Sequence, residues 1–338
     1  MKVLQIANYK EGVGGISVQV KLLKDKLLAE GCECDIISTK GSAWQRFLSI
    51  ASLLKIGKNY DIFHVHACSG RGFLPAIIGI SAGRLLGKRV ILTYHGGGAR
   101  EYFERRTKLV KHYLTRTSAN IVLSDFIGSL FDRFGLKYTI IPNIIELDAG
   151  HFKKREVIHP HFICIRSLSA TYNIECLLRA FKAFQNDRPD AVLTLLGDGP
   201  LRSQLESFVE SQDIKNVHFM GQVSNDAIYD QLDQADIMVS TSRFDNMPVS
   251  ILEGFNAGLL VIASDVGGIP YMIENGKNGL LFESNDDKML AEKMAYAVEN
   301  QELSITMIAN ARKSLDRYSW ENSKGRLLDL YYDKHGVL

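Results

Sequence analysis

Two acidic residues, Asp245 and Glu253, flank a short stretch of the sequence whose pattern favours ligand binding. Residues 246–248 (Asn-Met-Pro) predict a helix start, because Asn is a favoured N-cap and Pro is tolerated in a first turn. The free N–H groups of that turn would face the carboxyl end of the apolar strand 237–239, where open α/β sheets bind ligands. Glu253 would lie about 7 Å further along the helix axis, at ~1.5 Å per residue. The simpler interpretation is a capping Asp and a solvated helix Glu.

A histidine and an arginine follow two other predicted strands. His95 comes after the strand 89–93 and is followed by three glycines, which pack nothing and favour a side chain that faces a ligand. Arg166 follows the strand 162–165, and a guanidinium at that edge suits bidentate binding of a diphosphate. The alternatives are a structural histidine and an exposed structural arginine.

Glycine-rich turns occur at the same predicted edges. Gly14 and Gly15 connect the first strand, residues 3–7, to a helix expected over residues 16–30, which makes an anion-binding corner. Many α/β proteins carry such a turn for packing alone, and the G-x-G-x-x-G spacing of dinucleotide-binding proteins is absent. Gly221 follows the strand 216–220 in a turn that continues to Val223.

The stretch from Ser240 to Pro270 resembles the donor site of retaining, GT-B fold glycosyltransferases of family 4. The family hallmark is an acidic residue, seven residues and a Glu, and Asp245 and Glu253 have that spacing. The run from Gly258 to Gly268 continues the pattern. The family usually has Glu at the first acidic position, so Asp245 departs from it by one methylene group.

The resemblance implies roles for the residues that match. Glu253 would hold the ribose hydroxyls of the donor, and Asp245 would hold the sugar hydroxyls together with backbone amides. The full implied site is Gly14 and Gly15 near the phosphates, His95 beside the transferred sugar, Arg166 on the diphosphate, Gly221 and Val223 against the nucleobase, and Asn246, Met247 and Pro248 around the sugar. Family members commonly add a Lys five residues after the Arg, where this chain has Thr171. They also have Glu where this chain has Tyr271.

Short apolar runs that alternate with longer periodic segments predict an α/β fold with parallel sheets. The resemblance implies two Rossmann-like doubly wound domains that face each other across a cleft. We expect an acceptor-side domain over residues 1–145, a nucleotide-sugar donor domain over 146–317, and a helix in 318–338 that crosses back to the first domain, with Ser319 as the N-cap of this helix. The polar, aperiodic stretch 144–161 is the expected hinge.

Composition narrows the function class. Hydrophobic residues make up 46% and charged residues 23% of the 338 residues, as in ordinary globular proteins. The N-terminal apolar stretch is too short for a signal peptide, and no run reaches the ~20 apolar residues that span a bilayer. Five scattered cysteines are expected to be reduced core thiols. We expect a cytoplasmic protein that binds no nucleic acid.

The net charge of +2 conceals an asymmetry between the two halves. Residues 84–116 hold nine Lys or Arg against two Glu, whereas residues 197–253 hold ten Asp or Glu against three cations. One helix is expected over residues 100–117, and its cationic face is either simply solvated or holds the protein near an anionic membrane, at its inner face, or near a pyrophosphate-linked acceptor. The helix expected over residues 42–58 either packs its apolar stripe on the sheet or lies on a membrane surface.

The sequence therefore predicts a retaining glycosyltransferase that moves a sugar from a UDP- or GDP-sugar to an acceptor hydroxyl in surface polysaccharide or glycolipid synthesis. His64 and His66 would share one face of a strand, but no third ligand completes a metal site. No Asp-x-Asp clamp is present either, so we expect no metal and no cofactor. The alternatives are a catalytically impaired nucleotide-sugar binding protein, a nicotinamide-dependent oxidoreductase, and a phosphorylase or epimerase of the same fold.

Overall fold

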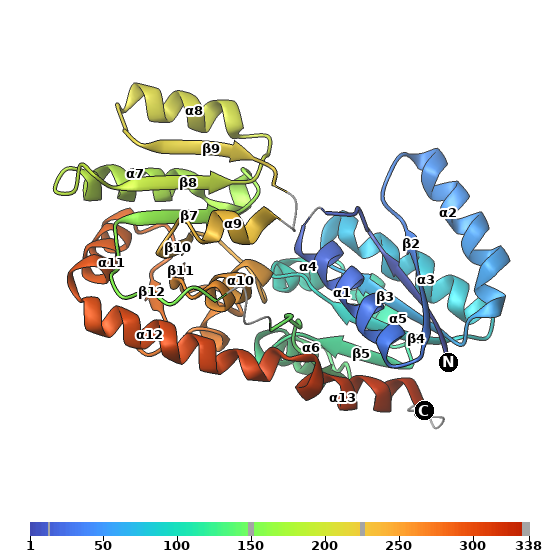
Figure 1. Cartoon of the computed structure of the whole chain (residues 1–338). Coiled ribbons are helices and arrows are strands. Elements are labelled where there is room, and N and C mark those ends of the chain that lie inside the picture. Colours follow the sequence, from blue (N-terminus) through green and yellow to red (C-terminus); the bar gives the residue numbers. More distant parts are fainter. Residues whose placement is uncertain (13, 148–151, 224–226, 333–338) are drawn as a thin grey trace. The chain divides into compact units, whose positions relative to one another are not determined.

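The computed structural model describes residues 1–12, 14–147, 152–223 and 227–332 (Figure 1). The chain divides into two compact units, Met1–Ile144 with Tyr318–Leu338, and Ile145–Arg317. Each unit holds one six-stranded sheet whose neighbouring strands all run parallel. The predicted α/β class with two Rossmann-like domains is therefore confirmed.

The sheet of the first unit has the strand order β2-β1-β3-β4-β5-β6. Strands β3 and β4 in its interior are almost entirely buried, as expected where helices cover both faces of a parallel sheet, and their apolar runs are interrupted by the buried polar residues His64, His66 and Thr93. The strands are β1 Lys2–Ala7, β2 Glu33–Ser38, β3 Ile62–Ala67, β4 Arg89–Tyr94, β5 Ala119–Val122 and β6 Thr139–Ile140. The helices are α1 Gly15–Ala29, α2 Ala43–Ile56, α3 Leu74–Leu85, α4 Ala99–Arg105, α5 Thr107–Leu114, α6 Asp125–Arg133 and α13 Trp320–Tyr332.

The sheet of the second unit has the order β12-β11-β10-β7-β8-β9, which Figure 1 shows as a stack of arrows. The strands are β7 His161–Ile165, β8 Val192–Leu196, β9 Val217–Gly221, β10 Ile237–Ser240, β11 Leu260–Ser264 and β12 Leu280–Phe282. The helices are α7 Ile174–Gln185, α8 Arg202–Ser211, α9 Ile228–Leu232, α10 Val249–Ala257, α11 Asp287–Glu299 and α12 Gln301–Ser314.

Each sheet has one point where the strand order reverses. It lies between β1 and β3 in the first unit and between β7 and β10 in the second. The loops that leave two such strands at their carboxyl ends diverge to opposite faces, so a crevice opens between them, and ligands of open α/β sheets bind there. The connections after β7 and β10 carry Arg166 and Asp245, which places both beside the reversal of the second sheet.

The last helix, α13, belongs to the first unit, as predicted. Its apolar side chains Trp320, Leu327 and Tyr331 join a buried cluster with strand residues that include Val3 and Ile62. The predicted N-cap of this helix is also confirmed, since the Ser319 hydroxyl accepts a hydrogen bond from the Asn322 amide.

Two local expectations were wrong. Residues 100–117 form two helices, because the backbone at Arg106 (φ −129°, ψ 30°) leaves the helical region. Helix α10 begins at Val249 with Pro248 as its cap, so Asn246 is not the N-cap.

Of the two alternatives for α2, packing of its whole apolar stripe on the sheet is excluded. Trp44, Phe47 and Leu48 are exposed to 67%, 59% and 49%.

Within the described residues, no helix combines the length and apolar character that a bilayer crossing requires. All five cysteines are free thiols, and four of them are buried.

Arg155 anchors the start of the second unit, in the stretch where the sequence predicted a hinge. Its side chain is 1% exposed and forms an ion pair with Asp236 at 3.1 Å. Its guanidinium also donates to the carbonyl oxygens of Leu232, Ala235 and Ala257. Of the expected hinge, residues 148–151 lie outside the described residues, whereas the part around Arg155 is tied firmly to the second unit.

We predict that Arg155→Met destabilises the second unit by about 3 kcal/mol, because removing one partner of a buried ion pair leaves the other charge poorly compensated. Thermal and urea unfolding would show a lower transition. Lys154→Met is the matched control, because Lys154 pairs with Glu156 at an exposed site. Equal transitions for the two variants would contradict the anchoring role of Arg155.

Candidate active site

The candidate site of the second unit is formed by loops that leave the carboxyl ends of neighbouring strands and lock onto one another. The loop after β11 contacts the loop after β10 so closely that a Cβ on Gly267 would overlap the carbonyl oxygen of Asp245. Gly267 also has a φ of +59°, which strongly favours glycine. The Gly268 amide then donates to the same Asp245 oxygen, at 3.1 Å. The predicted Gly-Gly turn thus fixes the backbone that carries Asp245.

The loop after β7 is held from both sides. A Cβ on Gly197, after β8, would overlap the carbonyl oxygen of Arg166. On the other side, the Arg243 amide donates to the carbonyl of Thr171 at 2.8 Å, and the Thr241 hydroxyl donates to the carbonyl of Tyr172. Thr171, which stands where the family has Lys, therefore serves the loop through its backbone.

Arg166 and Asp245 meet at the reversal point of the second sheet. Their side chains form an ion pair at 3.4 Å, and both are largely buried. The Arg166 guanidinium also donates to the Ser240 hydroxyl at 3.1 Å and lies over the Tyr172 ring at 5.3 Å from its centre. Among the described residues, its buried Nε has no hydrogen-bond partner. A cation with an unused N–H at this edge is suited to receive an anion.

Glu253 is placed by helix α10. Every other residue of this helix is buried, and Glu253 alone retains a partly exposed surface. Burial raises the pKa of the Glu253 carboxyl to about 7, and the positive charge of Arg166 opposes part of this rise. Within the part of the chain that the structure describes, the carboxyl forms no hydrogen bond or ion pair. The carboxyl oxygens of Glu253 are therefore available to a ligand that donates hydrogen bonds.

The other predicted donor residues surround this pair in different ways. The Asn246 amide donates to the Asp245 carboxylate at 2.9 Å, so it holds that side chain in place. Asn246, Met247 and Pro248 are buried in the turn before α10. Gly221 ends β9 with a φ of +71°, and its carbonyl accepts from the Gly197 amide, which joins the β8 and β9 loops. Val223 is half-buried two residues later.

The first unit carries the remaining predicted residues at its own carboxyl edge. Gly14, with a φ of +82°, caps helix α1, and Gly15 is the first residue of that helix. His95 follows β4 and is half-buried, and burial lowers its pKa to about 4. Gly96 lets the loop after His95 approach the loop after β3, since a Cβ there would lie 2.9 Å from the Ser69 nitrogen.

Behind His95 lies a chain of buried polar side chains that the sequence did not identify. His95 Nε2 is 3.0 Å from His66 Nδ1, and His66 Nε2 is 3.0 Å from Gln5 Oε1. The rings of His64 and His66 stack at 4.4 Å, which confirms the prediction that they share a face. Gln5 offered no signal, because a single amide in an apolar strand is noticed only when its partners are known.

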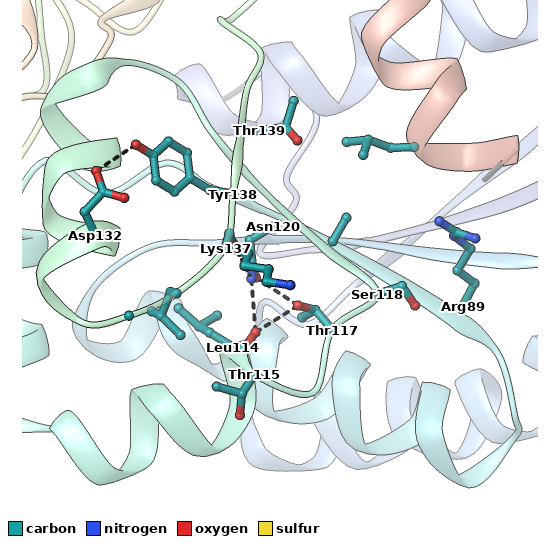
Figure 2. Close-up of a pocket in the computed structure, with 14 residues that line it drawn as sticks. Arg89, Leu114, Thr115, Thr117, Ser118, Asn120, Asp132, Lys137, Tyr138 and Thr139 are labelled. Carbon is teal, nitrogen blue, oxygen red and sulfur yellow. Dashed lines mark hydrogen bonds between the residues drawn. The ribbon is translucent and has the colours of Figure 1, made fainter. Parts of the chain in front are cut away.

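No group of three or more His, Cys, Asp or Glu in the described chain is arranged to hold a metal ion. A cavity of about 760 Å³ lies in the first unit, at the amino ends of β4, β5 and β6, opposite to the edge that carries His95 (Figure 2). Several polar groups in its wall are bonded to one another: Tyr138 donates to Asp132, and Asn120 donates to the carbonyls of Leu114 and Lys137. It is separate from the candidate site.

Comparison with known proteins gives the same picture for both halves. A family model for glycosyl transferases group 1 matches residues 151–314, and one for Glycosyltransferase Family 4 matches residues 39–149. An uncharacterized glycosyltransferase of Methanocaldococcus jannaschii is 25% identical over 346 residues, which cover 95% of this chain and 95% of that protein.

Two further relatives have more specific names. The UDP-Gal:alpha-D-GlcNAc-diphosphoundecaprenol alpha-1,3-galactosyltransferase of Escherichia coli is 26% identical over 311 residues, covering 85% of this chain and 78% of that protein. The structure of Anabaena HepE in complex with UDP matches with a TM-score of 0.74 at 16% identity, over 98% of this chain and 99% of that one. At 16% identity, the likeness to HepE is a likeness of fold.

We predict that Glu253→Gln stabilises the unliganded protein at pH 8 and not at pH 4.5. The folded-state pKa of about 7 lies above the ordinary 4.5, so ionisation costs the folded state nothing below pH 4.5. The cost grows between pH 4.5 and 7 and reaches about 3 kcal/mol above that range. Melting curves at both pH values would show it. The exposed Glu292→Gln is the control, and a shift for Glu253→Gln that does not change with pH would contradict the raised pKa.

Proposed function

Because this chain belongs to the GT-B fold glycosyltransferases of family 4, with both halves matched by glycosyltransferase family models, we propose that it transfers a sugar with retention of anomeric configuration. The donor is a nucleotide diphosphate sugar, with uracil or guanine as the base, and the acceptor is a hydroxyl group. The second unit binds the donor and the first unit binds the acceptor.

The ion pair of Arg166 and Asp245 is the observation that carries this proposal. It combines a cation for a diphosphate and a carboxylate for sugar hydroxyls at the reversal point of the second sheet. A diphosphate that takes the unpartnered Nε–H of Arg166 would satisfy a buried donor and gain a charge-assisted hydrogen bond. Glu253, one turn into α10, is the group for the ribose hydroxyls.

The chemical problem is the charge that develops as the donor breaks apart. The bond between the anomeric carbon and the phosphate oxygen breaks, and the acceptor oxygen forms a new bond on the same face. The acceptor proton passes to the leaving diphosphate. Arg166 and backbone amides stabilise the negative charge on that leaving group, so the proposed reaction requires no metal and no other cofactor.

The relatives support a nucleotide-sugar donor. HepE was solved with UDP, and the name of the E. coli relative gives UDP-Gal as donor and a diphosphoundecaprenol-linked sugar as acceptor. We therefore propose an acceptor that is a carbohydrate or a lipid-linked carbohydrate, used in surface polysaccharide or glycolipid synthesis.

A lipid-linked acceptor would bring the protein to a membrane, and helix α2 of the first unit is suited to that contact. Trp44, Phe47 and Leu48 are exposed together, and the Trp44 and Phe47 rings stack at 5.6 Å. Residues 36–60 contain four Lys or Arg and no acidic residue. Aromatic side chains with cationic flanks are typical of helices that lie in the interface of anionic membranes. We place the protein in the cytoplasm, at the inner face of the membrane.

The donor proposal predicts that UDP or GDP raises the melting temperature and that a nucleotide sugar is consumed when an acceptor is present. Arg166→Ala and Glu253→Ala should each weaken nucleotide binding about 10-fold or more, as expected for a lost hydrogen bond to a charged group. Wild-type binding should also weaken as the pH falls below 7, because protonation of Glu253 removes a hydrogen-bond acceptor.

Calorimetric titration at pH 6 and pH 8 measures both effects, with Glu292→Ala as an exposed control. Wild-type affinity in Glu253→Ala would exclude the ribose assignment. Binding that depends on Arg166 but leads to no transfer with any donor and acceptor would instead favour a nucleotide-sugar binding protein.

The membrane proposal predicts that the protein sediments with anionic vesicles. The double variant Trp44→Ser/Phe47→Ser should bind them about 10-fold more weakly, because two large apolar side chains no longer enter the interface. Leu303→Ser, which removes another exposed large apolar side chain, in the second unit, should bind like the wild type. Equal binding by all three proteins would exclude α2 as the contact.

A further inference from the structure

Gln5, His66 and His95 form a series of buried hydrogen bonds, and the bond at its Gln5 end determines which atom donates in each. Gln5 is fully buried in β1, and its Nε2 donates to the backbone carbonyl of Val20 at 3.0 Å. A carbonyl oxygen only accepts hydrogen bonds, so the amide nitrogen of Gln5 must face Val20. The Gln5 oxygen, Oε1, therefore faces His66, and it too can only accept.

This orientation sets the proton positions on both histidines. His66 Nε2, at 3.0 Å from Gln5 Oε1, must carry a proton and donate it. A neutral imidazole has only one N–H, so Nδ1 of His66 is an acceptor. His95 Nε2, 3.0 Å away, must then be the donor. The remaining nitrogen of His95, Nδ1, is left as a bare lone pair, and it has no hydrogen-bond partner in the described part of the chain.

These proton positions exist only while both rings are neutral, and the surroundings of the rings keep them so. Burial lowers the pKa of His66 well below its ordinary value and that of His95 to about 4. His64 lies next to this pair, and burial lowers the pKa of His64 to about 3. His64 is bonded to Thr93 and Tyr331 and stacks on His66. Among the residues that the structure describes, no acidic side chain bonds to any of the three rings.

We propose that Gln5 and His66 are positioning residues that hold His95 as its Nε2-protonated tautomer, so that Nδ1 accepts a hydrogen bond from a substrate hydroxyl. The substrate side of this inference rests on the proposed function, whereas the tautomer does not. With so low a proton affinity, His95 is a fixed acceptor rather than a general base at neutral pH. It discriminates for a hydroxyl and against a group that only accepts hydrogen bonds, such as a carbonyl.

The direct test is the tautomer itself. Long-range ¹H–¹⁵N correlation spectra of the full-length, ¹⁵N-histidine-labelled protein distinguish protonated from bare ring nitrogens, and His95→Asn assigns the His95 signals. At pH 7.5 and without any substrate, we expect a neutral His95 with the proton on Nε2. A proton on Nδ1, or a charged ring, would overturn the proposal whatever the enzyme transfers.

The role of the hydrogen bonds behind His95 is tested by Gln5→Leu. This substitution removes the oxygen that accepts from His66 and keeps the size of the side chain. His66 can then place its proton on Nδ1 and donate to His95, so the His95 signals should move towards a mixture of tautomers. Thr93→Val is the matched control, because it removes a partner of His64 outside the chain. Unchanged His95 signals in a folded Gln5→Leu protein, or equal changes in Thr93→Val, would overturn the role of Gln5.

If sugar transfer is observed, the same variant gives a kinetic result. Gln5→Leu should lower kcat about 10-fold with little change in the KM for the donor, as expected when one hydrogen bond is lost mainly in the transition state. Thr93→Val should keep the wild-type kcat. If Gln5→Leu does not fold, the wild-type spectrum still decides the tautomer.

Discussion

Close approach of backbones at the carboxyl edge of the second sheet is the constraint on which the candidate site depends. The loops after β8 and β11 press against the carbonyl oxygens of Arg166 and Asp245, where any side chain on Gly197 or Gly267 would overlap them. These backbone contacts fix the loops that carry the two opposite charges, whose side chains lie 3.4 Å apart. Loops held by such contacts reduce the free energy that a ligand must spend on ordering its site.

Burial sets the protonation states of two of the candidate residues, Glu253 and His95. Glu253 is the only partly exposed residue of an otherwise buried helix, and its carboxyl is near its titration point at neutral pH. In the first unit, burial keeps His95 neutral, and a chain of bonded side chains supports it. Each unit therefore offers a hydrogen-bonding group for a neutral hydroxyl, and the second unit adds the positive charge of Arg166. Within the second unit, this combination suits a ligand that joins a sugar to a diphosphate.

The sequence predicts those features that depend on local pattern. The alternation of strands and helices, the spacing of Asp245 and Glu253 and the Ser319 cap could be read directly. The features that it missed depend on distant contacts. Arg155 looked like part of a polar hinge, because its partners lie about 80 to 100 residues away. Gln5 looked like an ordinary strand residue, because its role depends on His66. The surroundings of Trp44 could not be decided, because periodicity shows that a stripe is apolar but not what covers it.

The return of the last helix to the first unit has a consequence for how the chain matures. Residues 145–317 are contiguous and hold all of their own strands, so the second unit can fold as soon as it leaves the ribosome. The first unit cannot finish at that stage. Its apolar face beside Val3 and Ile62 and the imidazole of His64 lack partners until Trp320 and Tyr331 are made, and both residues follow the whole second unit in the sequence. The first unit therefore becomes complete only after the second unit has been synthesised.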